Sequence, residues 1–174
     1  MEQVVKFRVL VDRKENEDIF RDIEMLGSHT FVELHSAIQE AFAFDNSQMA
    51  SFYISDENWE RGQEIALMDM GLPGAKPEET PLIMSEEPIA QHVITQGHKQ
   101  FIYVFDFFLM WTFIIEVISV DPLKSVSSDY PNVSLSYGEA PDQYSKEPDT
   151  DFGGTMDMDN PFDDEDSPYD DALN

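Results

Sequence analysis

The sequence predicts an α+β fold: a mainly antiparallel mixed sheet of about five to six strands with helices packed on one face, plus a disordered acidic C-terminal tail. Three observations support this prediction. Several short apolar segments alternate with period two, one segment has helical periodicity, and the composition changes after residue 144. Strands and helices do not alternate regularly along the chain, which disfavours a doubly wound parallel fold.

Four segments before residue 80 have the alternation typical of strands. Val4–Asp12 and Ile19–Leu26 are separated by a charged turn and predict a hairpin. Ser51–Asp56 and Glu64–Met70 predict two further strands. The glycine- and proline-containing segment Gly71–Pro81 predicts a loop.

One α-helix is predicted after the first hairpin. Thr30 and Glu33 form a capping-box pattern, in which the two side chains satisfy free backbone amides at the helix start. A shorter helix is predicted at Glu86–Ile94, with Pro88 in its first turn and Gly97 beyond its end. The long helix has one apolar face, formed by Phe31, Leu34, Ile38 and Phe42. We expect this face to pack on the part of the sheet that holds Tyr103, Phe105, Ile114 and Val117.

The segment Phe101–Val120 is apolar and twenty residues long, which is the length of a membrane-spanning helix. Asp106 and Glu116 argue against a span, because a central carboxylate costs roughly 2.5 to 3.5 kcal/mol on insertion scales. Fifteen of the twenty residues are β-branched or aromatic, types that suit a pleated strand. We therefore predict two interior strands, Gln100–Phe108 and Met110–Asp121, although Leu109 and Met110 are unusual hairpin-turn residues.

Composition limits the possible functions. The net charge of −26 repels phosphate backbones, so direct nucleic-acid binding is not expected. The chain has no cysteine, which excludes disulfides and thiolate chemistry and suits a cytoplasmic location. No signal-peptide pattern is found in the first twenty residues, and the oligomeric state is left open.

The chain is predicted to divide into a folded domain, residues 1–144, and an acidic tail, residues 145–174. The tail holds eleven acids and one base. Its few apolar residues cannot offset the conformational entropy that the chain would lose on ordering. Asp149–Asn160 partly matches a calcium loop but lacks the final glutamate, so diffuse counterion attraction is the simpler interpretation. The candidate binding residues for a basic partner are Phe162, Asp163, Asp164, Glu165 and Asp166.

Five segments in order carry a resemblance to a known family: VKFRVLVD, TFVELHSAIQEAF, QMASFYISDENWERGQEIAL, VFDFFLMW and GEAPDQ. Over about Val4 to Gln143 the chain resembles the Ri-plasmid open-reading-frame-three-like family, also described as insertion-element passenger proteins. The resemblance implies an α+β fold with a largely antiparallel sheet, and no established activity. Where family members have a His-Leu pair this chain has Gln48 and Met49, so it resembles a divergent branch with an acidic extension.

Two functions follow as hypotheses. The first is a non-catalytic protein-interaction module that uses its acidic surface and tail. The alternative is a hydrolase-like enzyme with an unidentified site. The sequence assigns no catalytic, cofactor or metal residue, because His29, His35, His92 and His98 cannot be grouped with a nucleophile from sequence alone. A buried Asp106 is expected to make a structural hydrogen bond rather than to act in catalysis.

Overall fold

The computed structural model describes residues 1–13, 17–71, 73–74, 76–77, 80–124 and 129–148. The candidate tail residues 162–166 and the calcium-like segment 149–160 lie outside these described residues. The domain boundary predicted at residue 144 stays a prediction. The described chain continues past it, and Lys146 Nζ donates a hydrogen bond to the Met110 carbonyl at 2.5 Å.

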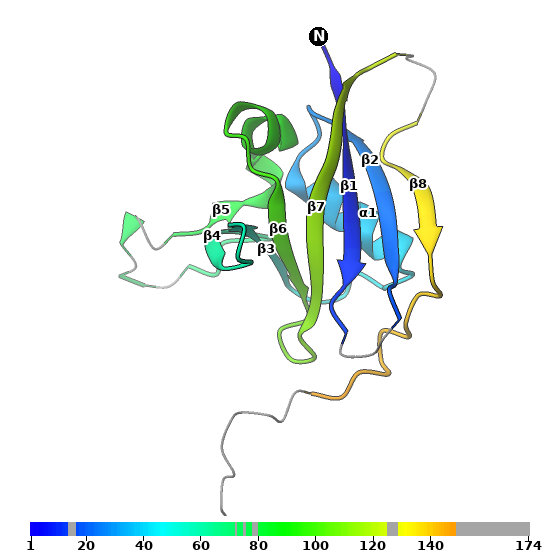
Figure 1. The fold of residues 1–174 in the computed structure, drawn as a ribbon. Coiled ribbons are helices and arrows are strands. Elements are labelled where there is room, and N and C mark those ends of the chain that lie inside the picture. The colour runs from blue at the N-terminus through cyan, green and yellow to red at the C-terminus, as the bar shows by residue number, and fades with distance from the viewer. Residues whose placement is uncertain (14–16, 72, 75, 78–79, 125–128, 149–174) are drawn as a thin grey trace, which may run out of the picture.

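The described residues form one mixed sheet of eight strands, more than the five to six predicted, in the order β5-β4-β3-β6-β7-β1-β2-β8 (Figure 1). All neighbouring pairs are antiparallel except β4 and β5, which are parallel. The α+β class is therefore confirmed. The strands are β1 (Gln3–Val11), β2 (Phe20–Leu26), β3 (Ala50–Ser55), β4 (Arg61–Ala66), β5 (Leu82–Ile83), β6 (Gln100–Phe105), β7 (Trp111–Pro122) and β8 (Asn132–Tyr137).

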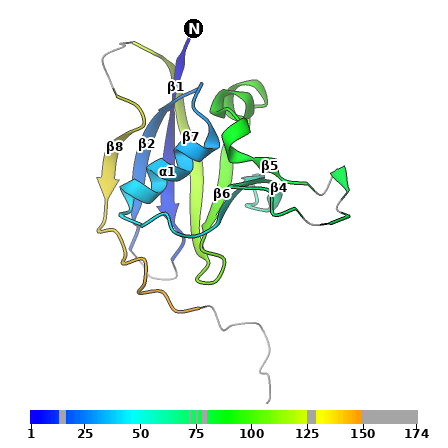
Figure 2. The same cartoon turned by 180° about the vertical axis from the view of Figure 1, so that it is seen from behind.

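The helix α1 (Phe31–Ala41) lies across one face of the sheet (Figures 1 and 2). The predicted capping box is present, with the Thr30 backbone amide 2.7 Å from Glu33 Oε2. The predicted apolar face is also confirmed, because Phe31, Leu34 and Ile38 have no solvent exposure. Sequence periodicity therefore gave the correct orientation of this helix.

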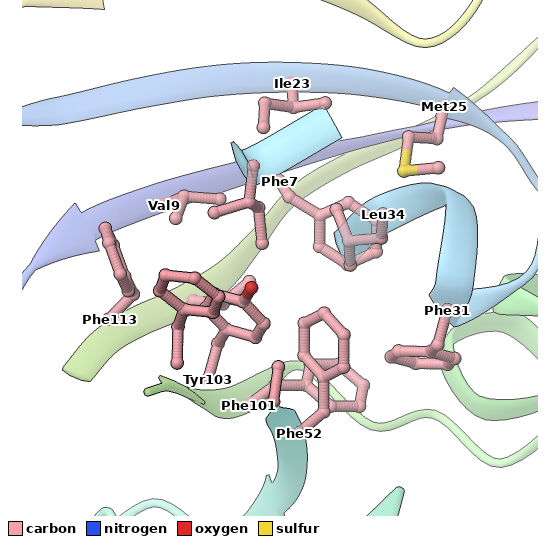
Figure 3. Close-up of a cluster of buried hydrophobic side chains, with 14 of the residues drawn as sticks. Phe7, Val9, Ile23, Met25, Phe31, Leu34, Phe52, Phe101, Tyr103 and Phe113 are labelled. Carbon is pink, nitrogen blue, oxygen red and sulfur yellow. The ribbon is translucent and has the colours of Figure 1, made fainter. Parts of the chain in front are cut away.

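An aromatic core fills the space between α1 and the sheet (Figure 3). Phe31 packs against Phe52 and Phe101 with ring centroids 5.2 and 5.5 Å apart. The helix packs on the predicted sheet: Tyr103 and Phe105 belong to this core, and Val117 packs against it. Ile114, in the same sheet, lies outside the core cluster and pairs with Ile102. Its two neighbours in β7, Phe113 and Ile115, face the core instead and are fully buried.

Strands β6 and β7 form the predicted hairpin at the centre of the sheet, but their turn is longer than expected. Asp106 adopts φ +59°, and its Oδ1 accepts hydrogen bonds from the amides of Phe108 and Leu109. This turn ends β6 at Phe105, so Phe107 and Phe108 are exposed turn residues rather than strand residues. Asp106 therefore has the structural role expected of it.

Among the described residues, no helix has both the length and the apolar character needed to cross a membrane.

The second predicted helix is reduced to short helical turns at one end of the sheet. These turns are η2 (Met84–Glu86) and η3 (Gln91–Thr95), separated by Pro88. Gly97 follows η3 with φ +76°, a conformation that suits glycine. The segment thus runs from the edge strand β5 back into the central strand β6.

Candidate functional site

His35, on α1, belongs to a buried polar network. Its Nδ1 lies 2.7 Å from the Tyr103 hydroxyl, and its Nε2 lies 2.6 Å from Asn46 Oδ1. Gln39 Nε2 donates a second hydrogen bond to the Tyr103 hydroxyl at 2.8 Å. The Asn46 oxygen can only accept, so Nε2 carries the proton and Nδ1 accepts from Tyr103.

Burial keeps both ring systems of this network uncharged. Desolvation lowers the pKa of His35, against the opposing effect of the Asn46 hydrogen bond. Desolvation also raises the pKa of the Tyr103 hydroxyl far above its usual range. With every ring partner satisfied and only 1% of His35 exposed, this histidine has a structural role.

A second polar cluster fastens the chain after β8 to the domain. Gln143 is 5% exposed, and its side chain exchanges two 2.8 Å hydrogen bonds with the backbone amide and Oδ1 of Asp45. Trp111 Nε1 donates to the Gln143 carbonyl at 2.9 Å, and Tyr144 donates its hydroxyl proton to Asp45. Hydrogen bonds from Ser47, Tyr144 and Gln143 hold the pKa of Asp45 well below its usual range. This cluster fixes where the chain leaves the sheet.

The strand β8, which sequence reasoning missed, forms one edge of the sheet. All six of its residues are exposed, so its composition resembled a polar linker. The only signal was alternation, because Val133, Leu135 and Tyr137 are separated by serines. β8 pairs with β2 on one side, and no described residue pairs with its other side.

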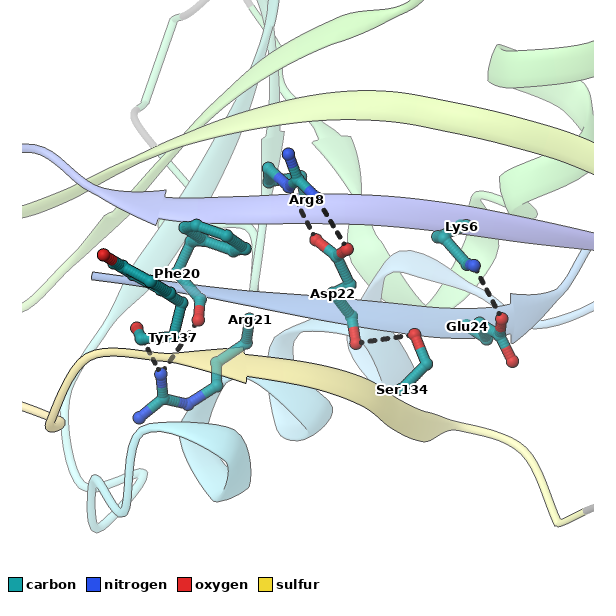
Figure 4. A network of polar contacts seen from close by, with 8 residues as sticks. All are labelled: Lys6, Arg8, Phe20, Arg21, Asp22, Glu24, Ser134 and Tyr137. Carbon is teal, nitrogen blue, oxygen red and sulfur yellow. Dashed lines mark hydrogen bonds and ion pairs between the residues drawn. The ribbon is translucent and has the colours of Figure 1, made fainter. Parts of the chain in front are cut away.

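Polar and aromatic contacts attach β8 to the rest of the sheet (Figure 4). The buried Arg21 guanidinium donates to the Tyr137 carbonyl at 3.0 Å, to the Phe20 carbonyl at 2.8 Å and to the Ala41 carbonyl at 3.3 Å. The rings of Phe20 and Tyr137 stack with centroids 5.2 Å apart. Arg21 therefore ties the end of α1 to β2 and β8, and sets the distance between helix and edge strand.

On the opposite face of the sheet, the nearby cations are neutralised by acids. Arg8 forms a bidentate pair with Asp22 at 2.8 and 2.9 Å, and Lys6 lies 3.2 Å from Glu24 (Figure 4). Bidentate pairing of this kind holds a guanidinium firmly to its partner. These cations are consequently poor contacts for an acidic ligand.

A groove of about 510 Å³ lies between α1 and β8. Ile23 lines it from β2, and the lining residues of α1 include the small side chains of Ser36, Ala37 and Ala41. Two carboxylates, Glu33 and Glu40, line it from the helix. They are two helical turns apart, which corresponds to about 10 Å along the axis. The remaining lining residues are Val32, Pro131, Asn132 and Val133.

This arrangement suits the docking of an extended peptide. The unpaired edge can form main-chain hydrogen bonds, and the groove beside it can receive an apolar side chain. The two carboxylates favour a lysine or arginine nearby. In the part of the chain that the structure describes, no cluster of three histidine or acidic side chains could hold a metal ion.

The other histidines lie outside this groove. His29 and His92 each have a buried Nδ1 without a hydrogen-bond partner among the described residues. His92 Nε2 lies 2.6 Å from Glu87 Oε2, and the His98 ring is 6.2 Å from the His92 ring. The Glu87–His92 pair was not predicted, because only the folding of η3 brings these two residues together across Pro88.

Comparisons with known proteins agree with this architecture. A family model described as plasmid pRiA4b ORF-3-like protein matches residues 3–168. Among solved structures, the chain is similar to the crystal structure of a protein of unknown function, MM3350, from Methanosarcina mazei Go1. The two share 19% identity with a TM-score of 0.65, over 84% of this chain and 75% of the other. No curated protein matches.

Proposed function

The chain belongs to the plasmid pRiA4b ORF-3-like family, and from this premise we propose that it is a non-catalytic protein-interaction module that binds a basic partner. The observation that carries the proposal is the unpaired edge of β8 beside the groove lined by Glu33 and Glu40. An extended segment of the partner adds a strand to β8, and its basic side chains face the two carboxylates.

The edge itself supports this mode of binding. Sheet edges are commonly protected by lysine, proline, a bulge or very short strands. β5, at the other edge, has only two residues, whereas β8 has six and contains neither lysine, arginine nor proline, although its pairing with β2 has one register shift, between Asp22 and Ile23. An exposed edge of this kind is a template for pairing with another chain.

Charge selects a basic partner over a second copy of the same chain. Each copy carries a net charge of −26, so two copies repel each other as their edges approach. A basic segment is instead attracted over distances set by the ionic strength. The tail residues 162–166, outside the described residues, add to this attraction in our proposal, and the cytoplasmic location stays a prediction.

The hydrolase-like alternative has less support. His35 has both ring nitrogens engaged inside the core, and its hydroxyl partner Tyr103 is fully buried. Across the described ranges, no serine or threonine hydroxyl is hydrogen-bonded to a histidine ring. A hydroxyl nucleophile activated by histidine would require such a contact.

The proposal is tested by fluorescence anisotropy with two labelled peptides, one alternating lysine with valine and one alternating glutamate with valine. We expect only the basic peptide to bind, and its affinity to fall as salt rises. Glu40→Lys is expected to weaken binding about threefold to tenfold, since it reverses one exposed charge. The matched control is Glu139→Lys, which makes the same change at an exposed position outside the groove.

Two results would contradict the proposal. Equal binding of the acidic and basic peptides would remove charge as the basis of recognition. An equal loss of peptide affinity in Glu40→Lys and in Glu139→Lys would show that net charge, and not the groove, attracts the peptide. A chain ending at Pro148 separates the contribution of the groove from that of the tail, because it keeps the described residues and lacks the rest of the tail.

A further inference from the structure

A hollow of about 340 Å³ lies at β3 and β4, towards the β5 edge of the sheet and away from the groove beside β8. Its two most buried lining residues, Ser51 of β3 and Ala66 of β4, pair directly across the two strands. Directly paired residues share one face of a sheet, and both of these side chains are small. The pair therefore leaves room between the larger side chains around it.

Backbone hydrogen bonds attach two walls of this hollow to the start of β3. The Asp106 amide donates to the Met49 carbonyl at 2.9 Å, which holds the turn between β6 and β7. The Leu67 amide donates to the Ala50 carbonyl at 3.1 Å, which holds the segment that follows β4. The turn and this segment both contribute lining residues, so the hollow is built on backbone that the sheet positions.

Most of the large side chains around the hollow are apolar. Met49, Met68, Met70 and Phe107 line it, and the last three are about half exposed or more. An apolar group bound between them would remove this surface from water. The flexible thioether of methionine adapts its shape to such a group and makes favourable contacts with aromatic rings. The hollow therefore suits an aromatic or alkyl body.

A carboxylate is held in place within this apolar surface. Glu64 lines the hollow and is half-buried, and the buried Ser51 hydroxyl donates to its Oε1 at 2.7 Å. Asp69 adds a second carboxylate, and none of the described residues that line the hollow is lysine, arginine or histidine. Arg61, in the same strand as Glu64, stacks over the Tyr53 ring at 5.0 Å and does not line the hollow.

The charge of Glu64 acts on its surroundings. Burial is the largest cause that raises the pKa of Tyr53, and the charge of Glu64 raises it further against the opposing charge of Arg61. Tyr53 and Glu64 are directly paired residues of β3 and β4. The same charge is available to a cation that enters the hollow.

We propose that this hollow binds a small amphiphilic amine, with its aromatic or alkyl body among the methionines and Phe107 and its ammonium group on Glu64. Sites for small molecules typically have volumes of about 300 to 1,000 Å³ and combine a mostly apolar lining with a few polar groups. An ammonium group has three donors and no acceptor, so it complements a carboxylate. The hollow shares no lining residue with the groove beside β8, so this proposal does not depend on the function proposed above.

The test is a titration of the full-length protein, labelled with ¹³C at its methionine methyl groups. The probes are 4-phenylbutylammonium chloride, sodium 4-phenylbutanoate with the opposite charge, and n-butylammonium chloride without the ring. We expect 4-phenylbutylammonium to shift the methyl resonances of Met49, Met68 and Met70 saturably, and to leave those of the fully buried Met25 and Met84 unchanged. The other two probes should bind at least about tenfold more weakly, since each lacks one half of the recognition.

A pair of matched variants separates the hollow from general attraction to an acidic protein. Glu64→Gln removes the charge and keeps a side-chain oxygen that can accept from Ser51. We expect about a fivefold to tenfold loss of affinity for 4-phenylbutylammonium. The control, Glu60→Gln, makes the same change at an exposed position outside the hollow and should leave the affinity unchanged.

Several results would overturn the proposal. They are the absence of a saturable shift at the three methionines, equal affinity for 4-phenylbutanoate or n-butylammonium, and equal losses in Glu64→Gln and Glu60→Gln. Without any probe, resonances of the three methionines that change with protein concentration would place a second copy of the chain on the hollow. Nuclear Overhauser contacts from these methyl groups to Met156 or Met158 would place the tail there instead.

Discussion

Replacing Tyr103 with phenylalanine tests the buried polar network most cleanly. The change removes only the hydroxyl oxygen, which accepts from Gln39 at 2.8 Å and lies 2.7 Å from His35 Nδ1. Phenylalanine keeps the ring contacts with Phe52 and Phe113, whose centroids are 4.8 and 5.6 Å away. The variant therefore loses hydrogen bonds without creating a large cavity.

The expected loss of stability follows from the groups left unpaired. Each hydrogen bond contributes about 1 kcal/mol net, and a buried polar atom left without a partner costs about 1 to 3 kcal/mol. His35 and Gln39 are 1% and 2% exposed, so water reaches neither readily. We expect the free energy of unfolding of Tyr103→Phe to fall by about 2 to 4 kcal/mol.

Urea denaturation monitored by circular dichroism measures this loss, with an unchanged m-value as the check that both states keep their compactness. The control is Tyr137→Phe, since Tyr137 is 57% exposed and its hydroxyl is expected to contribute less than about 0.5 kcal/mol. A loss in Tyr103→Phe no larger than in the control would refute the assigned network.

Two further predictions concern the core and its pH dependence. Leu34→Ala should lower the free energy of unfolding by about 2 to 5 kcal/mol, because Leu34 is fully buried under α1; a loss below about 0.5 kcal/mol in denaturant titration would mean that the helix face is misassigned. His35 has a lowered folded-state pKa, so the unfolded chain binds its proton first as pH falls. Stability should therefore be retained above about pH 6.5 and decline below it, by at most about 1.4 kcal/mol per pH unit from this residue. His35→Gln should flatten that decline, and an unchanged slope in the variant would assign the effect to other groups.

The sequence was sufficient where burial leaves a strong pattern. The helical spacing of Phe31, Leu34 and Ile38 predicted which face of α1 meets the sheet. The density of β-branched and aromatic residues in Phe101–Val120 predicted two central strands. In both cases the hydrophobic pattern directly reflects the packing, since these side chains have no other favourable environment.

The sequence predictions were wrong where interactions other than hydrophobic burial determine the structure. Asp106 ends β6 through its side-chain hydrogen bonds, a signal that counting apolar residues does not contain. In β7 the neighbours of Ile114 are equally apolar, so alternation alone does not distinguish the two faces of this central strand. β8 was missed because an edge strand with six exposed residues has little hydrophobic signal.

The candidate sites were harder to predict than the fold. The groove exists because β8 and α1 approach each other through Arg21, although β8 lies about a hundred residues further along the chain. The Glu87–His92 pair depends on a short helical turn that follows a proline. Neither feature is a local sequence pattern, so only the tertiary structure brings the residues together.

Hydrogen exchange at β8 in the presence of the lysine–valine peptide tests the central claim most directly. Backbone amides that gain a strand partner exchange more slowly, and unpaired amides do not. We predict that the peptide slows exchange within residues 132–137 and leaves the opposite edge, Leu82–Ile83, unchanged. Binding of the peptide with no added protection in β8, or with equal protection at both edges, would contradict the claim that this edge is the docking site.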